Sequence, residues 1–336
     1  MAPYKNGVII GKFMPPHAGH QYLIETARAQ VENLTVLVCS LENEPIPGHL
    51  RFEWVKELFP EVNVVHVSDE NPSYPHEHPD FWNMWKRTIL NNAAKPDVLF
   101  TSEEYGDQLA RVLGCKHISV DEDRKRFSIS GTSVRENPYA NWELLPSPVR
   151  AYYAKRVGIV GAESTGKTTL AEGLAKRLNT VWVPEFAVEY LKNGNVDVTS
   201  VEVIEAIARG QVKSEDEKAR KANRVLICDT DLMTTVIYSN YFLKTCPEWI
   251  VRESYERKYD LFLLTNIDIP WVGNKWRDAP HLREHFHDWF RRELELRHRP
   301  YVVISGSSIE ERLDHAMSAI ATLFDSRRAP GPSGIS

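Results

Sequence analysis

Residues 161–168 read G-A-E-S-T-G-K-T, which satisfies the phosphate-loop pattern G-x-x-x-x-G-K-[ST]. Its glycines let backbone N–H groups converge on phosphate oxygens at a helix N-terminus, while Lys167 supplies positive charge and Thr168 offers a hydroxyl to Mg²⁺. An apolar run precedes the pattern and a helix-forming run follows it, as the motif requires. We therefore expect an ATP or GTP site, with candidate contacts Gly161, Glu163, Ser164, Thr165, Gly166, Lys167, Thr168 and Thr169.

Acidic residues follow two further apolar runs in the same half of the chain. Asp229 closes the run 225–229, from which a carboxylate can reach Mg²⁺ or its water shell, although an acidic residue there can also be a helix cap. Glu185 follows the run 180–183 and can accept the proton of an attacking hydroxyl. Thr168 and Asp229 are thus the candidate metal contacts, and Glu185 is the candidate base.

A cationic, partly aromatic segment lies at residues 270–278. It favours a lid over the transferring phosphoryl group, with Arg277 available to balance charge. The preceding segment Thr265-Asn266-Ile267-Asp268 lacks the lysine of a guanine-reading motif. A small-molecule kinase therefore fits this half better than a GTPase.

A second candidate phosphate site lies near the start of the chain, where residues 11–20 contain H-x-G-H. His17 and His20 can donate hydrogen bonds to a triphosphate, and Gly19 allows close backbone approach. Downstream, residues 128–135 read S-I-S-G-T-S-V-R, in which small hydroxyl residues and an arginine can hold phosphates, although the serines alone could simply cap a helix. The two motifs together indicate nucleotidyl transfer.

Short apolar runs alternate with helix-length segments along the whole chain. This alternation predicts a parallel α/β sheet in each half. In the first helix, Leu23, Ile24, Ala27 and Val31 recur at helical spacing. The expected strands are residues 7–11, 35–39, 62–67, 98–100, 116–120, 156–161, 180–183, 225–229, 261–265 and 301–304.

Length and composition bound the class of protein. The chain has 336 residues, 42% of them hydrophobic and 26% charged, which suits two globular domains. Two prolines at 146 and 148 favour a boundary near residue 150, giving domains at 1–150 and 151–325, and the Pro/Gly/Ser-rich residues 326–336 are expected to be a disordered tail.

The net charge, the cysteine spacing and the hydropathy of the chain argue against several classes of partner. The net charge of −5 argues against a general nucleic-acid binder. The four cysteines form no CxxC pair, and no run is apolar enough for a membrane span or a signal peptide. We expect a cytoplasmic protein with reduced thiols that binds neither membrane nor nucleic acid, and a homo-oligomer stays open.

Taken together, these motifs match a known pattern. G-x-F-x-P-x-H-x-G-H followed by I-S-G-x-x-x-R resembles the HxGH nucleotidyltransferases, and the order of this domain and the phosphate loop resembles NadR-type bifunctional nicotinamide-nucleotide adenylyltransferase/ribosylnicotinamide kinases. The similarity covers roughly residues 5–325. It implies a Rossmann-like nucleotidyltransferase domain followed by a P-loop kinase α/β domain.

The resemblance also implies two reactions. The kinase half would phosphorylate nicotinamide riboside with ATP and Mg²⁺, and the N-terminal half would join the resulting nicotinamide mononucleotide (NMN) to AMP from ATP, giving NAD and pyrophosphate. Glu185 and Asp231 would bind the riboside. Trp82 and Asp80 would bind NMN, with Trp82 stacking on the nicotinamide ring, although a core aromatic is the alternative for Trp82. The adenylyltransferase ATP contacts would be Gly11, Lys12, Phe13, His17, Gly19, His20, Ser130, Thr132 and Arg135.

Two departures and two alternatives accompany this interpretation. Some family members carry an N-terminal helix-turn-helix, whereas here the first catalytic strand begins near residue 7, so repressor activity is not expected. Val188 stands where the family commonly has an arginine. A phosphopantetheine adenylyltransferase/dephospho-CoA kinase fusion and a non-catalytic nucleotide sensor stay open, while a class I aminoacyl-tRNA synthetase is disfavoured because no K-M-S-K-S loop is present.

Overall fold

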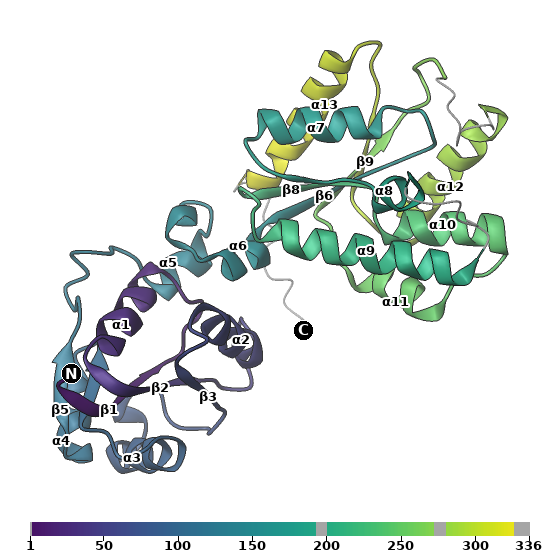
Figure 1. Cartoon of the computed structure of the whole chain (residues 1–336). Helices are drawn as coiled ribbons and strands as arrows, with labels where there is room; N and C mark the ends of the chain where they lie inside the picture. The colour runs from purple at the N-terminus through teal and green to yellow at the C-terminus, as the bar shows by residue number, and fades with distance from the viewer. Residues whose placement is uncertain (1, 193–199, 272–279, 326–336) are drawn as a thin grey trace. The chain divides into compact units, whose positions relative to one another are not determined.

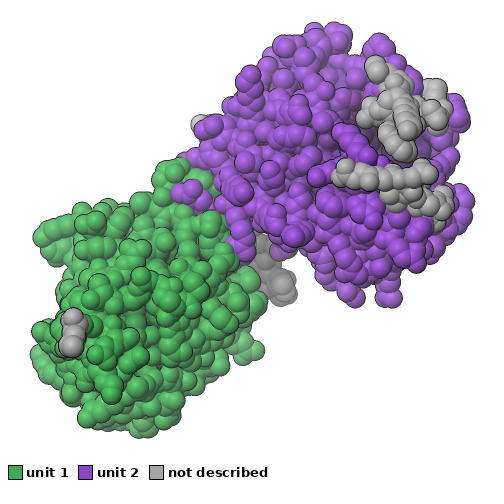
Figure 2. All heavy atoms as spheres, viewed as in Figure 1, with its two compact units in different colours: residues 1–149 green, residues 150–336 purple. Residues whose placement is uncertain are grey.

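The computed structural model describes residues 2–192, 200–271 and 280–325 and divides into two compact units, Met1–Val149 and Arg150–Ser336 (Figure 2). Arg277 and residues 326–336 lie outside the described residues, and so do the lid and tail expectations that rest on them. Each unit contains one five-stranded sheet in which every named strand pair is parallel (Figure 1). The parallel α/β architecture expected for both halves is therefore confirmed.

Unit 1 has the strand order β3-β2-β1-β4-β5. Its strands are β1 (Tyr4–Gly11), β2 (Val31–Cys39), β3 (Asn63–Val67), β4 (Val98–Thr101) and β5 (Lys116–Ser119). Its helices are α1 (Ala18–Arg28), α2 (Gly48–Leu58), α3 (Phe81–Asn92), α4 (Gly106–Leu113) and α5 (Gly131–Glu136), with 3-10 turns at Pro75–Glu77 and Trp142–Leu144. Helix α6 (Ser147–Tyr153) contains the division between the units.

Both faces of the first sheet are buried. Ile9 and Val8 are adjacent in β1 and fully buried, yet they belong to different core clusters, because successive strand residues point to opposite faces. The cluster around Ile9 includes Leu23 and Val55 from α1 and α2, and the cluster around Val8 includes residues of α3 and α4. Because β1 lies between β2 and β4, the loop after β1 leaves the sheet where the strand order reverses, the usual ligand position in such folds.

Unit 2 has the strand order β10-β9-β6-β8-β7. Its strands are β6 (Lys155–Val160), β7 (Trp182–Val183), β8 (Val225–Asp229), β9 (Leu261–Thr265) and β10 (Tyr301–Ile304). Its helices are α7 (Lys167–Arg177), α8 (Phe186–Lys192), α9 (Val201–Ala219), α10 (Leu232–Leu243), α11 (Glu248–Glu256), α12 (Arg283–Leu296) and α13 (Ile309–Ala321), with 3-10 turns at Pro280–Leu282 and Thr322–Phe324.

Helices cover both faces of the second sheet as well. Figure 1 shows α7 and α13 on one face and α9 and α10 on the other. Leu170 of α7 and Leu313 of α13 join the strand residues Val157 and Leu263 in one core cluster. Strand β6 lies between β8 and β9, so the loop after β6 also starts where the strand order reverses.

One sequence-based assignment is wrong. Val31 does not extend the first helix, because α1 ends at Arg28 and Val31 is the first residue of β2, paired with Tyr4. Val31 is buried by the sheet core, so its helical spacing from Ala27 is coincidental. Among the described helices, none combines the length and apolar character that crossing a membrane requires.

Candidate functional site

The H-x-G-H segment is folded against the start of α1. His17 is the extended N-cap residue of this helix, and the His17 and His20 rings lie with their centroids 3.8 Å apart. The Phe13 ring is 4.9 Å from the His20 ring. A Cβ on Gly19 would lie 3.1 Å from Cε1 of His17, so the glycine leaves room for the imidazole. The structure thus brings the two histidines together at the carboxyl end of β1.

Both imidazoles are neutral at pH 7. Burial, with a smaller contribution from the nearby Arg124 guanidinium, lowers the pKa of His17 to about 4. Burial also holds the pKa of His20 well below its usual range, assisted by His17 and Arg124. The Nδ1 atoms of both rings are buried and lack a hydrogen-bond partner among the described residues. A neutral ring keeps one N–H group, which can be donated to a phosphate oxygen without a positively charged imidazole.

The serine-rich segment lies directly against this loop. A Cβ on Gly131 would lie 2.6 Å from the carbonyl oxygen of Met14, which shows how closely the start of α5 approaches it. Nη1 of Arg135 donates to the same carbonyl oxygen at 2.5 Å, and Nη2 donates to Thr132 Oγ1 at 3.1 Å. The two motifs are more than 100 residues apart in sequence, yet they are in direct contact in unit 1.

Ser130 acts as a helix cap in this structure. Its Oγ accepts the backbone N–H of Ser133 at 3.1 Å, and Oγ of Ser133 accepts the backbone N–H of Ser130 at 3.1 Å. This reciprocal pair is a capping box, the structural alternative considered for the serine-rich turn. A contact between Ser130 and a phosphate would use the hydroxyl hydrogen of Ser130, because the capping bond uses only its oxygen as an acceptor.

Lys12 lies within a charged group at the other side of the loop. Its Nζ is 2.9 Å from Oε1 of Glu44 and donates to Ser73 Oγ at 3.1 Å. Arg51, whose side chain is fully buried, forms an ion pair with Glu44 and donates to the carbonyl oxygen of Lys12 at 2.6 Å. The sequence analysis missed both Arg51 and Arg124, because neither belongs to a motif.

The proposed NMN contacts lie at the start of α3. Oδ1 of Asp80 accepts from Asn83 at 2.7 Å and Oδ2 accepts from Arg87 at 3.0 Å, and these bonds lower the pKa of Asp80. Trp82 is half-buried, meets the Phe81 ring edge-on at 4.9 Å, and packs against the core cluster that contains Val8. Trp82 is thus part of the core packing, and its contact with a nicotinamide ring stays a prediction.

In unit 2 the phosphate loop connects β6 directly to α7. Gly161 and Gly166 have φ angles of 142° and 79°, a region that side chains rarely allow, and a Cβ on Gly161 would lie 2.4 Å from Thr265 Oγ1. Nζ of Lys167 donates to the carbonyl oxygens of Gly161 and Ala162, both at 3.0 Å. The lysine ammonium is therefore held at the mouth of the loop.

Thr168 and Asp229 are brought together from α7 and β8. Oγ1 of Thr168 donates to Oδ2 of Asp229 at 2.6 Å, and the Asp229 side chain is fully buried. Asp231 instead is the N-cap of α10, because its Oδ1 accepts both the N–H and the hydroxyl of Thr234 at 3.1 Å. Burial raises the pKa of Asp231. The role of helix cap, which the sequence left open for Asp229, is therefore filled by Asp231.

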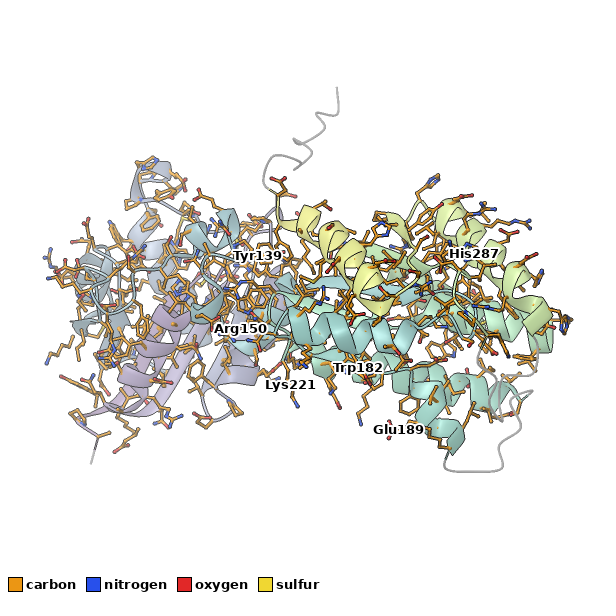
Figure 3. All side chains as sticks on the ribbon, turned by 90° about the horizontal axis from the view of Figure 1, so that it is seen from above. Tyr139, Arg150, Trp182, Glu189, Lys221 and His287 are labelled. Carbon is orange, nitrogen blue, oxygen red and sulfur yellow. The ribbon has the colours of Figure 1, made fainter. Side chains whose placement is uncertain are left out.

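Glu185 stands between β7 and α8, at the edge of the second sheet. Trp182 in β7 and Glu189 in α8 mark these neighbouring elements in Figure 3. Glu185 is partly buried, and Val188, the residue that departs from the family pattern, is 42% exposed. Because Val183 pairs with Cys228, Glu185 follows the strand next to the one that ends at Asp229.

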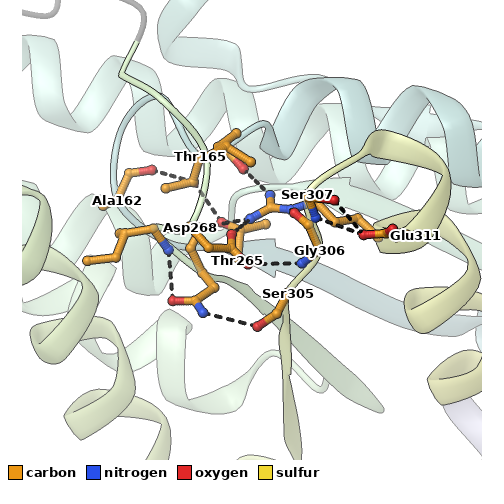
Figure 4. Close-up of polar contacts among 12 residues, drawn as sticks. Ala162, Thr165, Thr265, Asp268, Ser305, Gly306, Ser307 and Glu311 are labelled. Atoms are coloured by element: carbon orange, nitrogen blue, oxygen red, sulfur yellow. Dashed lines mark hydrogen bonds and ion pairs between the residues drawn. The ribbon is translucent and has the colours of Figure 1, made fainter.

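Two arginines that sequence analysis missed hold the phosphate loop. Arg312 of α13 donates to the carbonyl oxygens of Thr165 at 2.7 Å and Asn266 at 2.9 Å, and it pairs with Asp268. Figure 4 shows the polar contacts around Thr165 and Asp268. Arg283 of α12 donates to the carbonyl oxygen of Ser164 at 3.3 Å. No local pattern marks either arginine, because each reaches the loop only through the tertiary fold.

Comparison with known proteins agrees with this division. Residues 8–137 match the family model described as cytidylyltransferase-like, and residues 156–312 match the one described as an AAA domain. The chain is 27% identical to the trifunctional NAD biosynthesis/regulator protein NadR of Escherichia coli strain K12, over 96% of this chain and 84% of that protein.

Two solved NadR structures share the fold of the whole chain. A NadR protein in complex with NAD and AMP-PNP is 22% identical, with a TM-score of 0.74, covering 96% of each chain. A NadR protein in complex with NR has the same TM-score at 23% identity, covering 95% of this chain and 96% of that one. The order of the two units is therefore the same in these proteins.

Proposed function

We propose that this chain is a bifunctional enzyme of NAD biosynthesis, because it is similar to NadR proteins along both of its units. Unit 2 phosphorylates nicotinamide riboside with ATP, and unit 1 transfers the adenylyl group of a second ATP to the resulting NMN, giving NAD and pyrophosphate. One observation carries this proposal. Two separate phosphate loops, each leaving its own sheet where the strand order reverses, occur in the order of the two NadR catalytic halves.

In unit 1, the NMN phosphate attacks the α-phosphorus of ATP and negative charge builds up on the transferring group. His17 and His20 each donate one N–H group to the ATP phosphates, and Arg135 and Lys12 supply positive charge. The His17 ring is buried, and a charge interaction is stronger in such a low-dielectric environment. Asp80 and Trp82 are the proposed contacts for NMN.

In unit 2, the riboside hydroxyl attacks the γ-phosphorus of ATP. Lys167 balances charge on the β- and γ-phosphates, Glu185 accepts the hydroxyl proton, and Asp231 lies on the riboside side. Arg277 stays a proposed lid contact. The backbone N–H groups at the start of α7 face the phosphates.

Mg²⁺ fits the oxygen donors of this loop. The described residues contain no group of three or more His, Cys, Asp or Glu side chains that could hold a metal by themselves, whereas Thr168 and Asp229 place a hydroxyl and a buried carboxylate together. Mg²⁺ typically takes one or two protein oxygens and completes its shell with water and substrate phosphates. Thr168 and Asp229 would hold the ion, which would supply charge neutralisation on the phosphates.

Product analysis with two single-site variants tests the proposal. His20→Ala should lower NAD formation from NMN by about 100-fold or more while leaving riboside phosphorylation intact, because one N–H donor to the triphosphate is lost. Lys167→Ala should have the reverse effect, so each variant is the control for the other.

The outcomes separate the alternatives. NAD formation from NMN and NMN formation from riboside by the wild-type protein support both activities. Binding of ATP and NAD without pyrophosphate release would instead indicate a nucleotide sensor, and turnover only with phosphopantetheine would indicate the coenzyme A fusion. Loss of both activities in either folded variant would contradict two independent sites.

A further inference from the structure

Gln211 is a buried amide on the inner face of α9. Its side chain is only 3% exposed, and its Oε1 accepts the backbone N–H of Phe186 at 3.0 Å. Because a backbone N–H can only donate, this bond decides which end of the amide is oxygen. The NH₂ group therefore points away from Phe186. It is buried and has no hydrogen-bond partner within the described part of the chain.

A neighbouring buried polar side chain on the same helix face has all the partners that Gln211 lacks. Glu215, one turn further along α9 and fully buried, accepts from the Tyr259 hydroxyl at 2.8 Å and from Nε of Arg257 at 3.1 Å. Buried polar groups are nearly always satisfied in this way. An unused amide donor at Gln211 is therefore a feature that needs an acceptor from elsewhere.

Gln211 lies beside the segment that carries the proposed base. Phe186 directly follows Glu185, and a Cβ on Gly210 would lie 2.1 Å from the Phe186 ring, so α9 and this segment are in close contact. Val183 of β7 pairs with Cys228, which precedes the Asp229 that accepts from Thr168. The amide is thus next to the backbone of Glu185, the proposed base.

We propose that the NH₂ group of Gln211 donates a hydrogen bond to an oxygen of the nucleoside that unit 2 phosphorylates, either the carboxamide oxygen of the base or a sugar oxygen. This inference rests on the proposed riboside kinase activity. The oxygen of the same amide accepts the backbone N–H of Phe186, the residue after Glu185. Gln211 would therefore both bind the substrate and hold the backbone next to the proposed base.

Steady-state kinetics of a Gln211→Met variant of the full-length protein tests the inference. Methionine has a similar size and removes both the NH₂ donor and the oxygen that accepts the Phe186 N–H, so the substrate analogues described below separate the two effects. The expected result is a 10- to 100-fold loss of kcat/KM for nicotinamide riboside, with an unchanged KM for ATP and unchanged adenylyl transfer to NMN. Lys213→Met is the matched control, because Lys213 is on the same helix with its side chain 79% exposed, and it should behave as the wild type.

Substrate analogues identify the acceptor and exclude a purely structural role. Ribosylpyridinium lacks the carboxamide, and the 2′- and 3′-deoxy forms of nicotinamide riboside each lack one sugar hydroxyl. Gln211→Met should lose its effect with the analogue that lacks the true acceptor.

An equal loss with every analogue and with ATP would show that Gln211 only supports the fold, and no loss with nicotinamide riboside would overturn the inference directly. A wild-type protein that does not phosphorylate the riboside would refute the proposed function, and with it this inference. A Gln211→Met variant that does not fold would be replaced by Gln211→Leu, to which the same outcomes apply.

Discussion

Replacing Arg312 with methionine should destabilise unit 2 and weaken ATP binding by its phosphate loop. The guanidinium is buried and joins three segments that are distant in sequence, because it donates to the carbonyl oxygens of Thr165, Asn266 and Gly306 and pairs with Asp268 (Figure 4). The variant leaves these carbonyl oxygens without their donor, while Asp268 keeps the backbone N–H of Gly306 at 2.9 Å.

The size of the effect follows from burial. Removing one partner of a buried charge pair costs about 3–5 kcal/mol, and the lower end applies because the Asp268 side chain is 30% exposed. A loss of about 3 kcal/mol in a unit of this size should lower its melting temperature on the order of 10 °C. Since Thr165 belongs to the phosphate loop, the KM for ATP in the kinase reaction should rise, whereas adenylyl transfer should not change.

Differential scanning calorimetry and the two activity assays measure these effects together. Arg177→Met is the matched control, because Arg177 pairs with Asp314 at the surface, with side chains 36% and 74% exposed. Such a pair contributes at most about 1 kcal/mol. If Arg312→Met melts like Arg177→Met and keeps the wild-type KM for ATP, the argument that Arg312 anchors the loop is refuted.

Two further predictions concern unit 1. As the pH falls from about 6.5 to about 4, the unfolded chain binds a proton at His17 that the folded unit does not bind, so His17 should contribute a loss of up to about 3 kcal/mol in the stability of unit 1, in addition to any loss from His20. Denaturant unfolding of the wild type and of His17→Asn at both pH values measures the His17 contribution, and an unchanged pH dependence in the variant would exclude it. Gly131→Ala should reduce adenylyl transfer and leave the kinase reaction intact, because its Cβ would lie 2.6 Å from the Met14 carbonyl oxygen; full adenylyltransferase activity in this variant would show that the loop adapts without cost.

Local sequence patterns were sufficient to predict the features that depend on adjacent residues. The phosphate loop at 161–168 needs glycines at positive φ and a lysine at the helix start, and the structure has them there. Alternating apolar runs predicted the strands because a parallel sheet covered on both faces must be apolar on both. Val31 was misassigned because a buried residue just after a helix fits the helical spacing as well as a strand start.

The roles of single polar residues were harder to predict. Asp229 and Asp231 are two residues apart and both follow an apolar strand, yet one meets Thr168 of α7 and the other caps α10. Ser130 similarly carries a phosphate-binding pattern and a capping geometry at once. The difference depends on which backbone donor or neighbouring helix each oxygen faces, and that direction is absent from the order of residues.

The sequence by itself determined the H-x-G-H and phosphate-loop motifs, their order and the parallel α/β architecture, because each depends on neighbouring residues with fixed spacing. Only the tertiary structure decided which distant side chains complete the sites. Arg312 lies 147 residues beyond Thr165 and reaches its carbonyl oxygen only because α13 packs next to α7. Gln211 accepts from the backbone N–H of Phe186 across 25 residues, and its buried NH₂ group has no hydrogen-bond partner among the described residues. Burial and long-range contact belong to the folded chain, and they decide which polar groups are free to act.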